Sequence, residues 1–316
     1  MISFQTFDQW FVLTGYLSAI FFLIIVPVAK KSKWLFPRIE WCVKIMIPLI
    51  ILMAAIIPFL IEIPNEETTS IQNKVLGYSG KFIHIQVFVL FYFMLANYDK
   101  LGITLRHFWG FVVFMTLYSA LDLTIIEVLL AAPYKFWETI FPYLQQIGIK
   151  NTNFTDPINY LIKFIFLSLF FRDLFQDPLK KRFFQYLMYA LVVFELVQVF
   201  VFKSYQGYDS LSSTVKNVFI LGSTGLFMYK LYRADSHGIS LYKNPYFWLT
   251  LGLMLPALAE IFLEFIFTKL YQTDLLSFYK LYLVRNASQI VGFTLLIVGV
   301  WQAKYLRFCR RSIEYF

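Results

Sequence analysis

Ionisable side chains inside long apolar stretches are the residues of this sequence most able to do chemistry. An unpaired charge in hydrocarbon costs at least a few kcal/mol, so such a residue must pair, become neutral or serve a function. Seven Asp, Glu, Lys and Arg residues lie within these stretches and away from their ends: Asp122, Glu127, Lys163, Glu195, Glu260, Glu264 and Arg285.

Two acids and one base near the C-terminal end form the most suggestive group. Glu260 and Glu264 are four residues apart, so they share one face of a helix. Arg285 and Gln289 occupy the following apolar stretch at a similar expected depth. We predict a Glu264–Arg285 ion pair, with Glu260 as a deeper second partner. The pair either fixes the register of two helices or forms a ligand or proton site in an outward-facing cavity.

The deepest acids are Asp122 and Glu195, which makes them the best candidates for a proton relay. A protonated carboxyl group bonded to a neighbour such as Gln198 is an equally good interpretation of either acid. Lys163 lies one turn into its stretch, and we expect it to extend to the outer interface. His84 is expected to be a packed, hydrogen-bonded histidine and not a ligand.

Enzyme signatures are missing from the sequence. It contains no HExxH, no P-loop and no Gly-x-Ser-x-Gly, and it has only three histidines. The two cysteines, Cys42 and Cys309, are far apart in sequence and have no CxxC partner. We therefore predict no catalytic residues, no metal site and no cofactor.

The elements that must position these residues are membrane-spanning helices. The chain is 59% apolar and only 15% charged, which is far from the composition of a soluble domain. Each apolar stretch is long enough to cross a core about 30 Å thick at about 1.5 Å per residue. We predict an all-α, polytopic transmembrane bundle that forms a single domain over residues 1–316. Its nine spans are expected at residues 10–29, 42–62, 80–97, 108–132, 158–175, 184–203, 215–232, 245–268 and 281–303.

The basic residues predict the orientation of the bundle. Counted together with the span ends that border them, the segments after spans one, three, five, seven and nine hold 18 Lys and Arg residues, and the N-terminus and the other segments hold 8; Lys163 and Arg285 lie deeper inside spans. Cytoplasmic loops are enriched in Lys and Arg, so the N-terminus should face outward and the C-terminus should be cytoplasmic. The net charge of +9 is then a topology signal and an attraction to lipid head groups, not a sign of nucleic-acid binding.

Two segments between spans carry further information. Residues 63–79 are polar and acidic and are expected to form an outer loop. Residues 134–147 have aromatic residues at near-helical spacing, which indicates either an amphipathic helix on the outer membrane surface or a plain loop. Small residues at 222–225 are expected to allow close helix packing within one subunit, with a dimer face as the alternative.

From about residue 155 to 305 the sequence resembles a family of uncharacterised bacterial inner-membrane proteins. The stretches that carry the resemblance are INYLIKFIFLSLFFRDLFQDPLKKRFF, YDSLSSTVKNVFILGSTGLFMYKLY, KNPYFWLTLGLMLPALAEIFLEF and LVRNASQIVGFTLLIVGVWQ. The resemblance implies seven or eight helices, a location in the bacterial cytoplasmic membrane, and genes often found beside sensor histidine kinases. The last span of such proteins usually carries a His and then an Asn, where this chain has Arg285 and Gln289.

Three functions remain open from the sequence. The first is a non-enzymatic sensory or coupling module that binds a ligand or partner and acts through a sensor kinase or another membrane protein. The second is a structural subunit of a larger inner-membrane complex. The third is a transporter or channel that uses the intramembrane acids. For all three functions we expect the protein to lie in the lipid bilayer, and for none do we expect nucleic acid as a partner.

Overall fold

The structure is a computed structural model that describes residues 68–96, 105–124, 136–149, 152–235 and 244–302. The predicted spans 10–29 and 42–62, and Glu127, lie outside the described residues. Within the described ranges the chain is all-α, with eight α-helices joined by two short 3-10 turns. The helices are α4 (Thr68–Ala96), α5 (Arg106–Thr124), α6 (Phe136–Gln146), α7 (Asp156–Leu174), α8 (Pro178–Phe200), α9 (Ser210–Asp235), α10 (Pro245–Thr273) and α11 (Leu275–Trp301).

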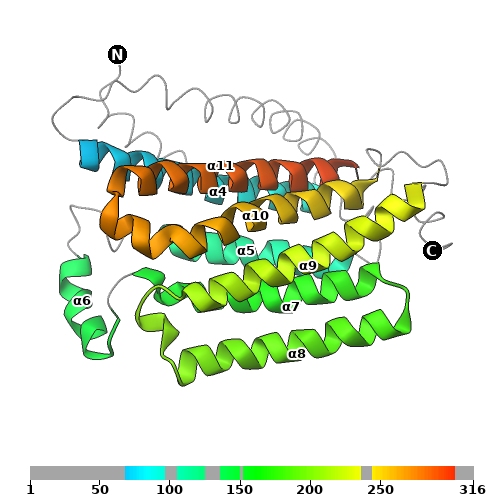
Figure 1. Cartoon of the computed structure of the whole chain (residues 1–316), viewed down its shortest axis with the longest axis horizontal. Coiled ribbons are helices and arrows are strands. Elements are labelled where there is room, and N and C mark those ends of the chain that lie inside the picture. Colours follow the sequence, from blue (N-terminus) through cyan, green and yellow to red (C-terminus); the bar gives the residue numbers. More distant parts are fainter. Residues whose placement is uncertain (1–67, 97–104, 125–135, 150–151, 236–243, 303–316) are drawn as a thin grey trace, which may run out of the picture.

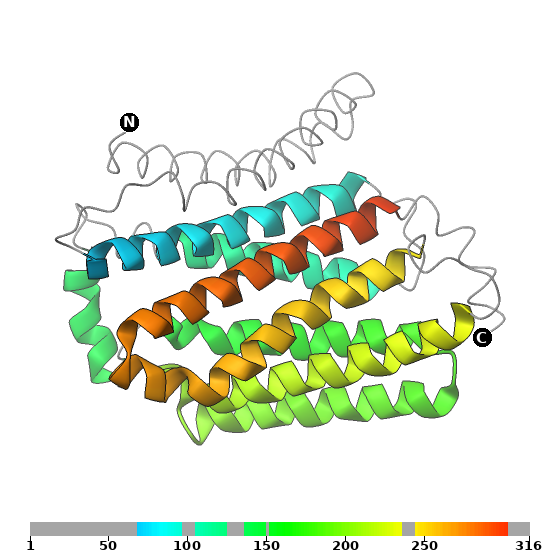
Figure 2. The same ribbon diagram turned by 45° about the horizontal axis from the view of Figure 1, so that its top comes forward.

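Six of the long helices form a closed ring. Around the ring, α4 packs on α5, α5 on α7, α7 on α9, α9 on α10, α10 on α11, and α11 returns to α4. The helices run roughly along one common direction, so the ring has two distinct ends (Figures 1 and 2). One end carries α6, the start of α4 and the turn between α10 and α11 (Figure 1). We refer to it as the α6 end.

Three helices among the described residues are long and apolar enough to cross a membrane. They are Pro178–Phe200, Pro245–Ile266 and Lys280–Trp301, and a shorter apolar stretch covers Phe82–Leu95. These features agree with a membrane protein built from helices that cross the bilayer more than once.

The starts of three helices are fixed by local capping. Asp177, Asn244 and Asp274 each accept a hydrogen bond from a backbone amide in the first turn of α8, α10 and α11, at 2.9, 3.0 and 3.1 Å. Proline follows as the first helical residue of α8 and α10, where its missing amide costs nothing. The Asn244–Pro245 pair therefore has a plain structural purpose, which is to begin α10.

Helix α4 corrects the prediction of an outer loop over residues 63–79. The helix begins at Thr68, so residues 68–79 are helical and extend the predicted span 80–97 toward the α6 end. Two hydrogen bonds attach this helix to α11: Asn286 Nδ2 donates to Ser79 Oγ at 2.7 Å, and Gln86 Nε2 donates to Thr294 Oγ1 at 3.1 Å. Ser79, which was predicted to lie in the outer loop, is thus a helical residue that bonds a neighbouring helix.

Helix α6 confirms that the segment 134–147 contains a helix. It lies across the α6 end of the bundle instead of running along it (Figures 1 and 2). Tyr143 is exposed, whereas Ile140, Phe141 and Leu144 are half-buried. Gly148, at a φ of 85°, ends the segment in the left-handed region that favours glycine.

Helices α10 and α11 approach each other closely at their glycines. A Cβ atom on Gly252 would lie 2.7 Å from the Gly292 carbonyl oxygen, and one on Gly299 would lie 2.9 Å from a Leu249 side-chain carbon. By contrast, a Cβ atom on Gly222 or Gly225 would meet nothing within 4 Å. The predicted role of residues 222–225 in close packing within the subunit is therefore wrong for these two glycines.

Helix α8 stands outside the ring and packs mainly on α7 (Figure 2). Its large apolar side chains are mostly exposed, as expected for a helix that faces lipid. The exposed residues include Leu179, Phe183, Tyr186, Tyr189, Val193, Leu196, Val197 and Phe200. The inner face joins an aromatic core in which Phe184 stacks on Phe175, with ring centroids 5.4 Å apart.

Candidate functional site

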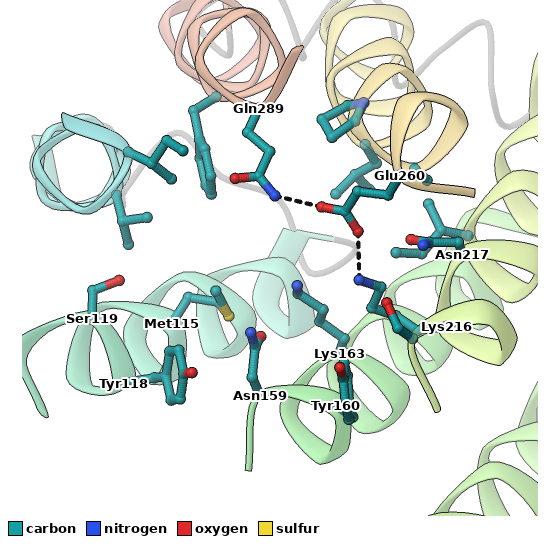
Figure 3. Close-up of a pocket in the computed structure, with 18 of the residues that line it drawn as sticks. Met115, Tyr118, Ser119, Asn159, Tyr160, Lys163, Lys216, Asn217, Glu260 and Gln289 are labelled. Carbon is teal, nitrogen blue, oxygen red and sulfur yellow. Dashed lines mark hydrogen bonds and ion pairs between the residues drawn. The ribbon is translucent and has the colours of Figure 1, made fainter. Parts of the chain in front are cut away.

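The ring of six helices surrounds a partly open cavity of 310 Å³ that is lined by both polar and apolar side chains. Every helix of the ring contributes to its wall, and α8 does not. Residues near the α6 end of α7, α9 and α11 supply most of its charged groups, which places the cavity toward that end. Figure 3 shows α5 side chains on one side of this space and Lys163, Lys216 and Glu260 on the other.

Glu260 of α10 is the centre of the charged network. One carboxylate oxygen lies 2.5 Å from Lys216 Nζ, and the side chains of this pair are only 6% and 4% exposed. The other oxygen accepts a hydrogen bond from Gln289 Nε2 of α11 and lies 3.8 Å from Arg285 Nε. A single acid therefore joins α9, α10 and α11 (Figure 3).

The start of α9 brings its polar residues to the cavity. Asp209 caps this helix by accepting from the Ser212 amide at 3.0 Å and from the Ser212 hydroxyl at 2.6 Å. The capped start directs Ser213, Lys216 and Asn217 to the cavity, because residues three and four apart share a helix face. Lys216 and Asn217 are 3% and 0% exposed.

Glu264 does not form the predicted ion pair with Arg285 in the described structure. It accepts hydrogen bonds from the hydroxyls of Tyr208, at 2.5 Å, and Ser213, at 2.6 Å. Burial, together with the Glu264 carboxylate, raises the pKa of the Tyr208 hydroxyl, so that hydroxyl stays protonated and donates. Helices α10 and α11 are bridged as expected, but through Glu260, because Glu264 is occupied by two hydroxyls on the α9 side.

Asp122 lies on the opposite wall and is paired with a histidine. Its carboxylate is 3.1 Å from His84 Nε2, which joins α5 to α4. Both residues line the cavity. The sequence predicted a packed and hydrogen-bonded His84, and the structure agrees, but the partner was not foreseen.

Glu195 is separate from the cavity residues. It lies on α8 and is fully buried, one turn from the buried Gln198. Neither of its carboxylate oxygens accepts a hydrogen bond from the described residues. The structure thus brings together Glu260, Arg285, Gln289 and Asp122, with Glu264 adjacent, and leaves Glu195 apart.

Two lysines of the cavity were misjudged from the sequence. Lys163 was expected to extend to the outer interface, but it lines the cavity and points toward Lys216 and Glu260 (Figure 3). Lys216 was counted with the outer segment that borders the span 215–232, although it is buried. The polar spacing of Ser213, Lys216 and Asn217 in an otherwise apolar helix is the signal that could have identified it.

Across the residues that the structure describes, no group of three or more His, Cys, Asp and Glu side chains could hold a metal ion. No protein-family model, no curated protein and no solved structure matches this chain.

Proposed function

We propose that this protein is a non-enzymatic, polytopic membrane protein that binds a small polar ligand in the cavity and couples the bound state to a partner. The observation that carries the proposal is a partly open cavity of 310 Å³ that is lined by six helices and by several charged and amide side chains. Ligand sites in proteins are typically cavities of about 300 Å³ or more with a few convergent polar groups. Charged groups are expensive in a membrane unless they serve packing or function.

The proposed arrangement has nine spans, an outward N-terminus and a cytoplasmic C-terminus. The described structure supports the alternation, because Arg106, Arg172, Lys180, Lys181 and Arg233 all lie near the end opposite α6. In a bacterial cytoplasmic membrane the α6 end would face outward, with α6 on the membrane surface. The cavity would then open toward the outside, and the basic end would meet a sensor kinase or another membrane protein.

The binding function is tested by filling the cavity. Gly80 of α4 lines the cavity, and a Cβ atom built there meets nothing within 4 Å. Gly80→Leu should therefore fill part of the cavity without a clash. Gly222→Leu is the matched control, since Gly222 is exposed on α9 and its Cβ position is equally open.

The measurement is mass spectrometry of small molecules released from purified, detergent-solubilised protein. We expect a compound that is released from the wild type and Gly222→Leu, and is depleted from Gly80→Leu. Identical profiles for all three proteins would contradict the proposed function. Partner proteins that co-purify with the wild type but not with Gly80→Leu would identify the coupled component.

A further inference from the structure

Two lysines from different helices lie over one buried phenyl ring at the end of the bundle opposite α6. Lys180 Nζ, near the start of α8, and Lys230 Nζ, near the end of α9, are each 5.4 Å from the centroid of the Phe175 ring. Phe175 directly follows α7, stacks on Phe184 of α8 and meets Phe227 of α9 edge-on, with ring centroids 5.4 and 5.9 Å away. The junction of three helices therefore presents two ammonium groups side by side.

Neither ammonium group has an anionic partner in the described chain. None of the ion pairs among the described residues includes Lys180 or Lys230. Lys230 donates a hydrogen bond to the Leu174 carbonyl oxygen at 3.4 Å, which holds the side chain in place but does not neutralise its charge. The face of a phenyl ring attracts a cation but carries no net charge. Within the described chain the two like charges therefore remain uncompensated.

The acids at this end of the bundle do not supply the missing charge. Asp173 is bound by His107 Nδ1 at 2.6 Å and by Arg172 Nε at 3.0 Å. Asp177 accepts the Leu179 backbone amide and so caps α8. The described helix ends here carry seven Lys and Arg residues and three acids: Arg106, Arg172, Lys180, Lys181, Arg182, Lys230 and Arg233, with Asp173, Asp177 and Asp235. The net charge stays positive even when every one of these acids is ionised.

The two lysines lie at the level of the protein where lipid head groups are expected. Lys180 is in the first turn of Pro178–Phe200, one of the helices long and apolar enough to cross a membrane. The start of α8 and the end of α9 lie at the same end of the bundle (Figures 1 and 2). The first turns of α8 also expose large apolar side chains, namely Leu179, Phe183 and Tyr186. Positive charge beside an exposed apolar surface fits an anionic lipid, whose head group and acyl chains need both.

We propose that the junction of α7, α8 and α9 binds an anionic phospholipid, with the phosphate of its head group between Lys180 and Lys230. One phosphate has several acceptor oxygens, so it can accept a hydrogen bond from each ammonium group at the same time. The acyl chains would lie along the exposed apolar face at the start of α8. Phe175, Lys180 and Lys230 do not line the cavity, so this inference is independent of the proposed function.

Native mass spectrometry of the detergent-purified full chain tests the inference. The probes are phosphatidylglycerol and phosphatidylcholine with identical acyl chains, so that the two lipids differ only in the head group and its net charge. We expect phosphatidylglycerol to bind at least about fivefold more tightly, because each lysine near a membrane surface strengthens the binding of anionic lipid by about that factor.

Variants assign the preference to the junction. Lys180→Met and Lys230→Met should each weaken the binding of phosphatidylglycerol about fivefold and leave phosphatidylcholine unchanged. Arginine at both positions keeps the two charges and should retain the preference. Lys181→Met is the matched control, since Lys181 is the exposed neighbour of Lys180 on the same helix and the same charge is removed. If Lys230→Met does not fold, Lys180→Met still decides the question, because Lys180 is exposed.

A preference that is lost in Lys180→Met and Lys230→Met but kept in Lys181→Met supports the inference. Equal binding of the two lipids to the wild type would overturn it. An equal loss in Lys181→Met and Lys180→Met would also overturn it, since only the overall charge of this end would then attract the lipid. Displacement of phosphatidylglycerol by an equal concentration of glycerol phosphate would indicate a site for a free phosphate instead. Gly80→Leu should leave lipid binding unchanged, which separates this result from the test of the cavity.

Discussion

Lys216 of α9 and Glu260 of α10 form a buried ion pair of 2.5 Å, at a point where two further residues of α11 approach the same carboxylate. This pair holds one wall of the cavity together. Removing one partner of a buried pair typically costs about 3–5 kcal/mol, because the remaining charge is left unpaired.

Lys216→Met should therefore destabilise the protein more than the double variant Lys216→Met, Glu260→Gln. We expect a loss of about 3 kcal/mol for the single change and recovery of a substantial part in the double change. Thermal unfolding in detergent measures both, with Lys181→Met as the control. Equal stability of the single and double variants would show that the two residues do not interact.

Glu264 should stabilise the fold through its hydrogen bonds with two hydroxyl groups and not through an ion pair. Glu264→Gln keeps a carbonyl oxygen that can accept from Tyr208 and Ser213, so we expect a change below about 1 kcal/mol. Glu264→Leu leaves both hydroxyls without an acceptor and should cost about 1–3 kcal/mol. The same unfolding assay compares them, and a large loss for Glu264→Gln would favour an ion pair with Arg285 instead.

The close contact between α10 and α11 should not tolerate an added methyl group. Gly252→Ala places a Cβ atom against the Gly292 carbonyl oxygen, and we expect a destabilisation of about 1–3 kcal/mol. Gly222→Ala is the control, because its Cβ atom meets nothing and alanine favours the helix by up to about 1 kcal/mol. Neutral behaviour of Gly252→Ala in unfolding measurements would mean that the two helices separate easily.

Cysteine labelling in intact cells checks the proposed orientation. In a variant with Cys42→Ser and Cys309→Ser, Tyr143→Cys on α6 should react with a membrane-impermeant maleimide. Lys181→Cys, at the opposite end, should react only after the membrane is permeabilised. Both side chains are exposed in the structure, so access is decided by the side of the membrane. The reverse pattern would invert the proposed topology.

The sequence predicts the helical class well because an apolar stretch in a membrane has few alternatives to a helix. Hydropathy also locates helices α7 to α11 with errors of at most six residues at either end; α10, for example, was expected at 245–268 and is observed at Pro245–Thr273. The start of α4 was missed because residues 68–79 are largely polar; Ser79, the last of them, bonds Asn286 of α11, and a partner on another helix cannot be read from a single-helix pattern.

Only part of the candidate site was predicted, because a sequence pattern describes one helix at a time. Sequence spacing identifies which residues share a face of one helix, and so it grouped Glu260 with Glu264 and Arg285 with Gln289. It does not show which helices are neighbours in the ring. The adjacency of α9 and α10 is what gives Glu260 its partner Lys216, and the adjacency of α4 and α5 is what pairs His84 with Asp122.

The closed ring has a consequence for how the protein is made. Helix α4 completes the circle by contacting α11, so the first and last of the described helices must meet. The bonds that join them connect residues 207 and 208 positions apart in the chain. The ring can therefore close only after nearly all of the described chain has been synthesised, and the cavity is complete only once α11 packs against α4.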